Sequence, residues 1–164
     1  MKVVLITHAK TSNKPPKRLS FAGRYGVEQV VDMIKGKLGE RYRIQKAVSS
    51  PAARCIDTAL VCMEEVGADD LNRLDTDHRL ARLDKADKLE AVIRDNAQEG
   101  LAVFCHADLG GVLPGKEKIM GIKEGWFEHK PVLVILDWGP SRAWNENTVE
   151  AVLTVPEETS LLKD

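Results

Sequence analysis

The sequence lacks the cysteine pattern of a disulfide-rich or zinc-binding protein. Its three cysteines, Cys55, Cys62 and Cys105, are far apart and form no C-x-x-C pair. All three lie in apolar segments with the pattern of a helix or a strand. We therefore expect reduced thiols within the core, no metal site and no cofactor.

The N-terminus lacks a long apolar run, and the chain as a whole lacks an excess of positive charge. Residues 3–6 are the only consecutive apolar residues before polar chain begins, which is too short for a signal peptide or a membrane span. Lys plus Arg number 24 against 25 Asp plus Glu, so no overall field attracts nucleic acid or an anionic membrane. These absences predict a cytoplasmic protein that binds neither nucleic acid nor a membrane.

The composition does provide a hydrophobic core. The chain has 164 residues, of which 43% are hydrophobic, and this size and content are typical of one domain. We see no internal repeat, low-complexity tract or linker in it. We expect a single domain over residues 1–164.

Short apolar runs alternate with segments of helical spacing. The expected strands are 3–6, 47–49, 101–105, 132–136 and 149–155, with a weaker candidate at 74–80. The expected helices are 20–38 with Ser20 as N-cap, 50–66 with Ser50 as N-cap and Pro51 in its first turn, and 86–97 closed by Gly100. This alternation predicts a three-layer α/β/α sandwich with a mostly parallel central sheet.

Polar residues directly follow three of the expected strands. His8 follows the first strand, Ser49 and Ser50 follow the second, and His106 follows strand 101–105. Ligands of open α/β sheets bind beyond the carboxyl ends of the strands. We therefore expect these three segments to meet at one site.

Arg54 adds a positive charge to this expected site. It would lie in the first turn of the second helix, where free backbone N–H groups and the helix dipole favour an anion such as a phosphoryl group. A neutral imidazole can attack phosphorus, and nearby cations keep it neutral by lowering its pKa. We expect His8 to be the nucleophile, with Arg54 and His106 stabilising charge on the phosphoryl oxygens.

Simpler interpretations of these residues exist. A loop carbonyl can satisfy His8, and His106 can be a core histidine. Arg54 can form a surface ion pair with Asp57, three residues further along the helix. Ser50 is explained as a helix cap, so any ligand contact from it would be secondary.

Four motifs, in order, resemble those of the histidine phosphatase superfamily, whose fold is shared with cofactor-dependent phosphoglycerate mutases. Residues 5–10, Leu-Ile-Thr-His-Ala-Lys, look like the strand and Arg-His-Gly or Arg-His-Ala element. Residues 19–23, Leu-Ser-Phe-Ala-Gly, resemble the step that begins the first helix. Residues 48–59 resemble the Ser-Ser-Pro-x-x-Arg-x-x-x-Thr-Ala block, and residues 103–106 the strand that ends in the second pocket histidine.

The resemblance implies a phosphoglycerate mutase-like domain with His8, Arg54 and His106 as catalytic residues. The short chain and the His-Ala pair are most similar to the SixA-type branch, which removes phosphate from phosphohistidine in proteins. The implied function is hydrolysis of a phosphomonoester or of protein phosphohistidine through a phosphohistidine intermediate at His8. The implied partner is a phosphorylated small molecule or a phosphoprotein. A mutase is a further alternative, but the chain lacks the length for the insertions that enclose such a substrate.

The chain departs from the family pattern at Thr7, where the family has arginine. A guanidinium clamps phosphate with two charged hydrogen bonds, whereas a threonine hydroxyl makes one neutral hydrogen bond. Losing such a group costs about 2.7–4 kcal/mol of transition-state stabilisation, or roughly a hundred- to a thousandfold in rate. We expect an attenuated phosphatase in which Thr7 and Lys10 also contact phosphate, and in which Lys10, Lys14, Lys17 or Arg18 can restore the charge. The alternative is an inactive relative that binds phosphate or a phosphorylated partner.

The general acid is left open by the sequence. Larger family members carry a glutamate near the third strand, where this chain has Arg82, Asp84 and Asp87. Asp108, two residues after His106, is a further candidate.

Overall fold

Six strands form one sheet in the order β3-β2-β4-β1-β5-β6. The computed structural model describes residues 1–9, 11–12, 18–68, 74–115 and 131–155. Within these residues the strands are β1 (Lys2–Thr7), β2 (Lys46–Ser49), β3 (Leu74–Thr76), β4 (Leu101–Cys105), β5 (Val132–Asp137) and β6 (Thr148–Thr154).

The sheet is parallel on one side and antiparallel on the other. Strands β3, β2, β4 and β1 are parallel neighbours, whereas β5 runs antiparallel to both β1 and β6. Residues 138–147 connect β5 to β6 directly, and so short a link suits antiparallel neighbours better than a crossover. The expected mostly parallel sheet is confirmed, with its antiparallel part confined to the C-terminal strands.

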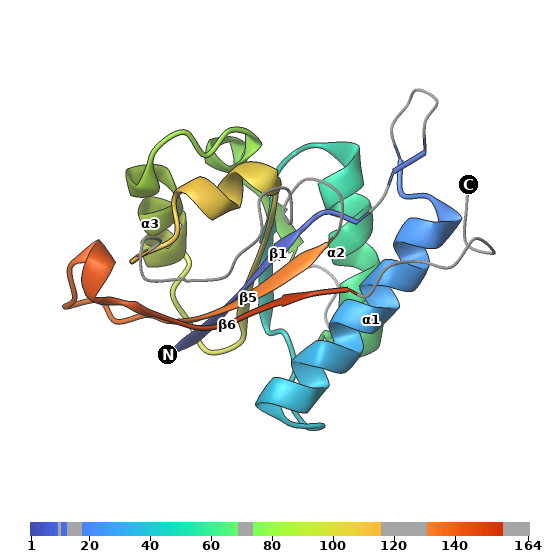
Figure 1. Ribbon diagram of the computed structural model, residues 1–164, viewed down its shortest axis with the longest axis horizontal. Coiled ribbons are helices and arrows are strands. Elements are labelled where there is room, and N and C mark those ends of the chain that lie inside the picture. Colours follow the sequence, from blue (N-terminus) through green and yellow to red (C-terminus); the bar gives the residue numbers. More distant parts are fainter. Residues whose placement is uncertain (10, 13–17, 69–73, 116–130, 156–164) are drawn as a thin grey trace.

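Helices cover both faces of the sheet (Figure 1). Helices α1 (Phe21–Leu38) and α2 (Ala53–Val66) pack on one face, and α3 (Ala86–Asp95) packs on the other with the short 3-10 helices η2 (His78–Ala81) and η3 (Ala107–Gly111). A third 3-10 helix, η5 (Trp144–Glu146), lies before β6. The expected three-layer architecture is therefore confirmed.

The strands supply apolar side chains to both faces alternately. In β1, Val4 and Ile6 pack with α1 and α2, whereas Val3 and Leu5 pack with α3. This period of two is what a strand buried on both faces requires, and it explains why β1 reads as a continuous apolar run.

Helix α1 begins where the sequence predicts. Ser20 is its N-cap, and the Ser20 Oγ accepts a hydrogen bond of 2.9 Å from the backbone N–H of Gly23. The side chains of Val27, Val30 and Ile34 are buried at helical spacing. The cap and the apolar stripe therefore act together, as expected.

Helix α2 begins later than predicted, and Ser50 is not its N-cap. The helix starts at Ala53, its N-cap is Ala52, and no side chain caps it. The backbone N–H of Ser50 instead extends the sheet ladder by donating to the carbonyl of Phe104 at 2.9 Å. Ser50 thus remains at the strand end, where its hydroxyl lies within hydrogen-bond distance of the His106 ring.

Helix α3 also ends earlier than predicted, so Gly100 is not its closing residue. The helix ends at Asp95, with Asn96 as C-cap. Gly100 has a φ of +75° and lies against the backbone of Arg43 and Gln45, where a Cβ would come within 2.7–2.9 Å of other atoms. Gly100 therefore allows the chain to turn tightly into β4 close to the backbone that leads into β2.

The three cysteines are free and buried, which confirms the expectation of reduced core thiols. Among the described residues, no helix is both long and apolar enough to span a membrane.

Candidate functional site

Three adjacent parallel strands bring the predicted residues together. In the registers of β1, β4 and β2, Thr7 lies opposite Cys105, and Ser49 lies opposite Phe104. The strands therefore end almost level. His8 follows β1 and donates its backbone N–H to the Cys105 carbonyl at 3.0 Å, so the residues after β1 and β4 are direct neighbours.

The two histidines face each other across this sheet edge. The ring centroids of His8 and His106 are 5.5 Å apart, and the ring planes are inclined at 72°. Both side chains are half-buried. The structure thus brings together two imidazoles that are distant in the sequence.

One ring nitrogen of His8 is held by the backbone. The Nδ1 atom lies 3.0 Å from the carbonyl oxygen of Ala9. A carbonyl only accepts hydrogen bonds, so in the neutral ring the proton resides on Nδ1 and the lone pair on Nε2. This is the form in which Nε2 acts as a nucleophile.

Thr58 ties the segment after β1 to helix α2. Its Oγ1 accepts a hydrogen bond of 3.2 Å from the backbone N–H of Ala9 and donates one of 2.8 Å to the carbonyl of Arg54. Ala9, whose carbonyl orients His8, is therefore bound to the helix turn that carries Arg54. No role of Thr58 was predicted from its sequence context; its position four residues after Arg54 lets its hydroxyl reach back to the Arg54 carbonyl.

Arg54 brings a positive charge to the histidine pair. Its Nη2 lies 3.5 Å from the Nδ1 of His106. None of the ion pairs found among the described residues involves Arg54. Arg54 does not pair with Asp57, so the alternative interpretation of a surface ion pair is wrong. A guanidinium without a neighbouring carboxylate, beside two imidazoles, favours a bound anion.

Asp57 pairs with Arg18 instead. Arg18 Nε and Nη2 donate to the Asp57 carboxylate at 2.7 and 2.6 Å, and the Leu19 backbone N–H donates to it at 3.1 Å. The guanidinium of Arg18 holds the pKa of Asp57 below its usual range. Arg18 is therefore engaged, and Lys10, Lys14 and Lys17 lie outside the described residues.

His106 is held by two residues of the block that follows β2. The Ser50 Oγ lies 2.8 Å from its Nε2, and the Cys55 Sγ lies 3.6 Å from the same nitrogen. Burial raises the pKa of Cys55 to about 12, so its thiol stays neutral and packs against the ring. From the sequence, Cys55 is expected to be a core residue and Ser50 chiefly a helix cap near the site; a contact of either with His106 was not predicted.

Burial and charge keep both histidines neutral at pH 7. The pKa of His8 is lowered from 6.5, mainly by burial and further by Arg54, although its hydrogen bond to Ala9 opposes this. The pKa of His106 is lowered by burial, then by Arg54 and His8, against the opposing charge of Asp108. Each ring thus carries one nitrogen lone pair.

Thr7 is buried with its hydroxyl turned to a neighbouring strand. Its exposed fraction is 1%, and its Oγ1 accepts a hydrogen bond of 2.8 Å from the backbone N–H of Val132 at the start of β5. A contact between Thr7 and a bound anion stays a prediction.

Two of the candidate acids are occupied elsewhere. Asp84 forms an ion pair with Lys88 at 2.8 Å, and Asp108 accepts a hydrogen bond of 2.8 Å from the backbone N–H of Leu83. In the part of the chain that the structure describes, no group of three or more His, Cys, Asp or Glu side chains is placed to hold a metal ion.

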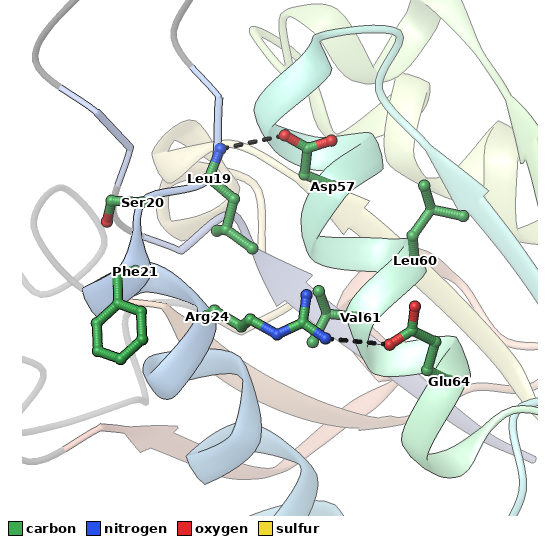
Figure 2. Close-up of a pocket in the computed structure, with 8 residues that line it drawn as sticks. All are labelled: Leu19, Ser20, Phe21, Arg24, Asp57, Leu60, Val61 and Glu64. Carbon is green, nitrogen blue, oxygen red and sulfur yellow. Dashed lines mark hydrogen bonds and ion pairs between the residues drawn. The ribbon is translucent and has the colours of Figure 1, made fainter.

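A separate groove of about 370 Å³ lies between α2 and the start of α1 (Figure 2). It is lined by Leu19, Ser20, Phe21, Arg24, Asp57, Leu60, Val61 and Glu64. None of the residues around the histidine pair lines it, because Arg54 and Asp57 point from α2 toward different neighbours. The groove is therefore separate from the histidine pair.

Comparisons with known proteins identify the fold. No family model and no curated protein matches the sequence. Solved structures do match: the protein histidine phosphatase SixA in complex with tungstate is 13% identical, with a TM-score of 0.70 over 94% of this chain and 97% of that chain. A protein described as a SixA phosphohistidine phosphatase from Agrobacterium tumefaciens is 18% identical, with a TM-score of 0.66 over 95% and 98% of the two chains.

The same fold occurs in a phosphoglycerate mutase from Bacillus anthracis. That structure is 13% identical, with a TM-score of 0.64 over 92% of each chain. Identities this low show a shared architecture rather than a shared activity. This chain therefore has the phosphoglycerate mutase-like fold that is also the fold of SixA phosphohistidine phosphatases.

Proposed function

We propose that this protein hydrolyses a phosphomonoester or protein phosphohistidine through a phosphohistidine intermediate at His8. The hydrogen bond between His8 Nδ1 and the Ala9 carbonyl carries this proposal, because it leaves the lone pair on Nε2. The guanidinium of Arg54 adds the positive charge that a phosphoryl group needs, and the neighbouring His106 ring adds a hydrogen-bond donor once it is protonated.

The first step transfers the phosphoryl group to His8. The Nε2 lone pair forms a bond to phosphorus while the bond from phosphorus to the leaving group breaks, and the leaving group keeps that electron pair and takes a proton from solvent. Arg54 donates hydrogen bonds to the phosphoryl oxygens, and His106 adds a further donor when it is protonated. The low pKa of His8 keeps the nucleophile neutral at pH 7.

The second step releases phosphate. A water oxygen adds to phosphorus as the bond to Nε2 breaks, and the electron pair returns to the ring. The water loses a proton to solvent, and inorganic phosphate leaves. The Ala9 carbonyl keeps Nδ1 protonated throughout, so the ring is ready for another cycle.

A phosphohistidine substrate fits the site better than an alkyl phosphate. Asp84 and Asp108 are both engaged with groups outside the histidine pair, so neither supplies an acid to the leaving group. The imidazole of a phosphohistidine can be protonated before its bond breaks, and it then leaves without a strong acid. The SixA-type neighbours support the same choice.

A second candidate function is phosphate binding without turnover. The observation that favours it is the engagement of the Thr7 hydroxyl with Val132, which places a neutral, occupied group where the resemblance calls for an arginine. A vanadate-induced rise in melting temperature without hydrolysis would support this candidate.

Turnover of an aryl phosphate and of a phosphohistidine peptide tests the main proposal. His8→Ala should abolish release of phosphate because it removes the nucleophile. His78→Ala is the matched control, because His78 is an exposed histidine on η2, which follows the edge strand β3, and should keep wild-type turnover. Equal release by wild type and the His8 variant would overturn the proposal.

Thr7→Arg tests whether the natural site is attenuated. A second guanidinium beside His8 and His106 should raise turnover by about a hundredfold or more. Thr7 is buried, so urea unfolding of the variant must accompany the assay to show that it is folded. A folded variant with unchanged turnover would mean that the missing arginine does not limit the reaction.

A further inference from the structure

Both ring nitrogens of His106 have protein neighbours. Nε2 lies 2.8 Å from the Oγ of Ser50 on the strand-end segment, and Nδ1 lies 3.5 Å from Nη2 of Arg54 on α2. Two different segments therefore define the orientation of one ring. A flip of the ring would replace both nitrogens by ring carbons, with Cε1 toward Ser50 and Cδ2 toward Arg54.

The neighbours also determine where the His106 proton lies. A guanidinium only donates hydrogen bonds, so the nitrogen that faces it, Nδ1, must carry the lone pair. The proton is then on Nε2 and is donated to the Ser50 hydroxyl, which can accept it. The backbone N–H of Ala52 also points at the Ser50 Oγ, at 3.3 Å, and helps to hold this oxygen in place.

We propose that Ser50 is a positioning residue that holds His106 in its Nε2–H form and directs Nδ1 toward Arg54 and the space beside His8. This inference rests on the proposed function, in which His106 contributes a hydrogen-bond donor to the phosphoryl group. With Nε2 held by Ser50, the nitrogen that gains a proton when an anion binds is Nδ1. That proton then lies between the ring and the bound phosphoryl oxygen.

The charged and titratable groups around His106 fit this assignment. Arg54 from α2 and His8 from the end of β1 lower its pKa, Asp108 from η3 raises it, and the Cys55 thiol remains neutral. An incoming phosphate dianion adds negative charge beside Nδ1. It should therefore raise the pKa of His106 and protonate this nitrogen.

Nitrogen-15 NMR of histidine-labelled protein tests the inference without requiring turnover. The His106 signals are assigned by comparison with His106→Gln. In the wild type, we expect Nε2 protonated and Nδ1 unprotonated above the pKa of His106, and a higher pKa when vanadate is added. A wild-type spectrum with the proton on Nδ1 would overturn the inference even if every variant failed to fold.

Serine variants separate positioning from general structure. Ser50→Ala should give a mixture of the two His106 tautomers, lower its pKa and weaken vanadate binding by about tenfold, because one hydrogen bond to the ring is lost. Ser50→Thr keeps the hydroxyl and should restore the wild-type spectrum. Ser49→Ala is the matched control, because the Ser49 hydroxyl is also buried but donates to the Ser50 carbonyl at 2.8 Å.

The outcomes distinguish this inference from the proposed function. If Ser50→Ala and Ser49→Ala both leave the His106 tautomer unchanged, Ser50 does not position the ring, whatever the turnover. If the tautomer changes only in Ser50→Ala while the wild type releases no phosphate, the positioning role holds and the proposed hydrolysis fails.

Discussion

At the scale of single residues, burial lowers the pKa of His8 and of His106. It is the largest cause that lowers the pKa of His8 and of His106 from 6.5, and Arg54 adds to it in both cases. Between the lowered pKa and 6.5, the unfolded chain binds more protons at these positions than the folded chain does. The folded state therefore loses stability as the pH falls through this range.

The pH dependence of stability should show this difference. We expect the contribution of each histidine to the free energy of unfolding to rise with pH below 6.5 and to level off above it. Urea unfolding at several pH values between about 5 and 8 measures the total. The comparison of wild type with His106→Gln isolates one contribution, and His78→Gln is the control. Parallel curves for wild type and His106→Gln would contradict the lowered pKa.

At the scale of elements, helix α2 contacts both the histidine pair and the segment that leads into α1. Arg54 extends from it toward His106, and one turn later Asp57 holds the segment that leads into α1. The Asp57 carboxylate accepts hydrogen bonds from both the Arg18 side chain and the Leu19 backbone. Arg54 thus extends from the side of α2 next to the histidine pair. Asp57 extends from the neighbouring side, where it stabilises the segment before α1.

Asp57→Ala should lower the free energy of unfolding by about 1–3 kcal/mol, because it leaves the Leu19 backbone N–H without its acceptor and removes the partner of Arg18. Glu64→Ala is the matched control on the same helix. The pair between Arg24 and Glu64 is exposed, with 53% of each side chain accessible, so its loss should cost about 0–1 kcal/mol. Equal losses in urea unfolding of the two variants would show that the Asp57 contacts contribute no more than an exposed ion pair.

Two glycines should respond in opposite directions to replacement by alanine. Gly100→Ala should destabilise the protein by more than about 1 kcal/mol, because its positive φ and the backbone of Arg43 and Gln45 leave no room for a Cβ. Gly36→Ala lies within α1 with no atom near the added Cβ, and it should stabilise the protein by about 1 kcal/mol. Thermal unfolding of both variants measures the difference. A stabilised Gly100→Ala would contradict the assigned turn.

At the scale of the whole molecule, positive charge is local rather than general. The chain has a formal net charge of -1, yet the guanidinium of Arg54 lies beside two imidazoles at the ends of the parallel strands β1 and β4. In the proposed site, a bound anion would contact residues that follow β1 and β4 and residues of α2. Binding should therefore stabilise the whole fold and not only one element.

Vanadate should raise the global stability of the wild type. At about 100 times its dissociation constant, a ligand that binds only the folded state adds about 2.7 kcal/mol to the free energy of unfolding. Arg54→Gln should lose most of this gain. Arg142→Gln, an exposed arginine in the connection between β5 and β6, should keep it. A gain that is the same in all three proteins would place the anion elsewhere.

Much of this protein can be predicted from local patterns in its sequence. The strands read as short apolar runs because a strand buried on both faces needs apolar residues at every position, and α1 is recognisable from Ser20 and the stripe that follows it. His8 and His106 stand out because each directly follows such a strand. The architecture and the meeting of three strand ends follow from these patterns by general rules of parallel sheets.

Only the tertiary structure decided what each polar group binds. Ser50 has the local signature of a helix cap, but its backbone extends the ladder beside β4, and its hydroxyl meets a histidine 56 residues away. Asp57 has an arginine three residues before it, yet it pairs with Arg18 across two elements. Local propensity depends on neighbours in the chain, whereas a hydrogen bond depends on neighbours in space, and these partners become neighbours only when the sheet and its helices have packed.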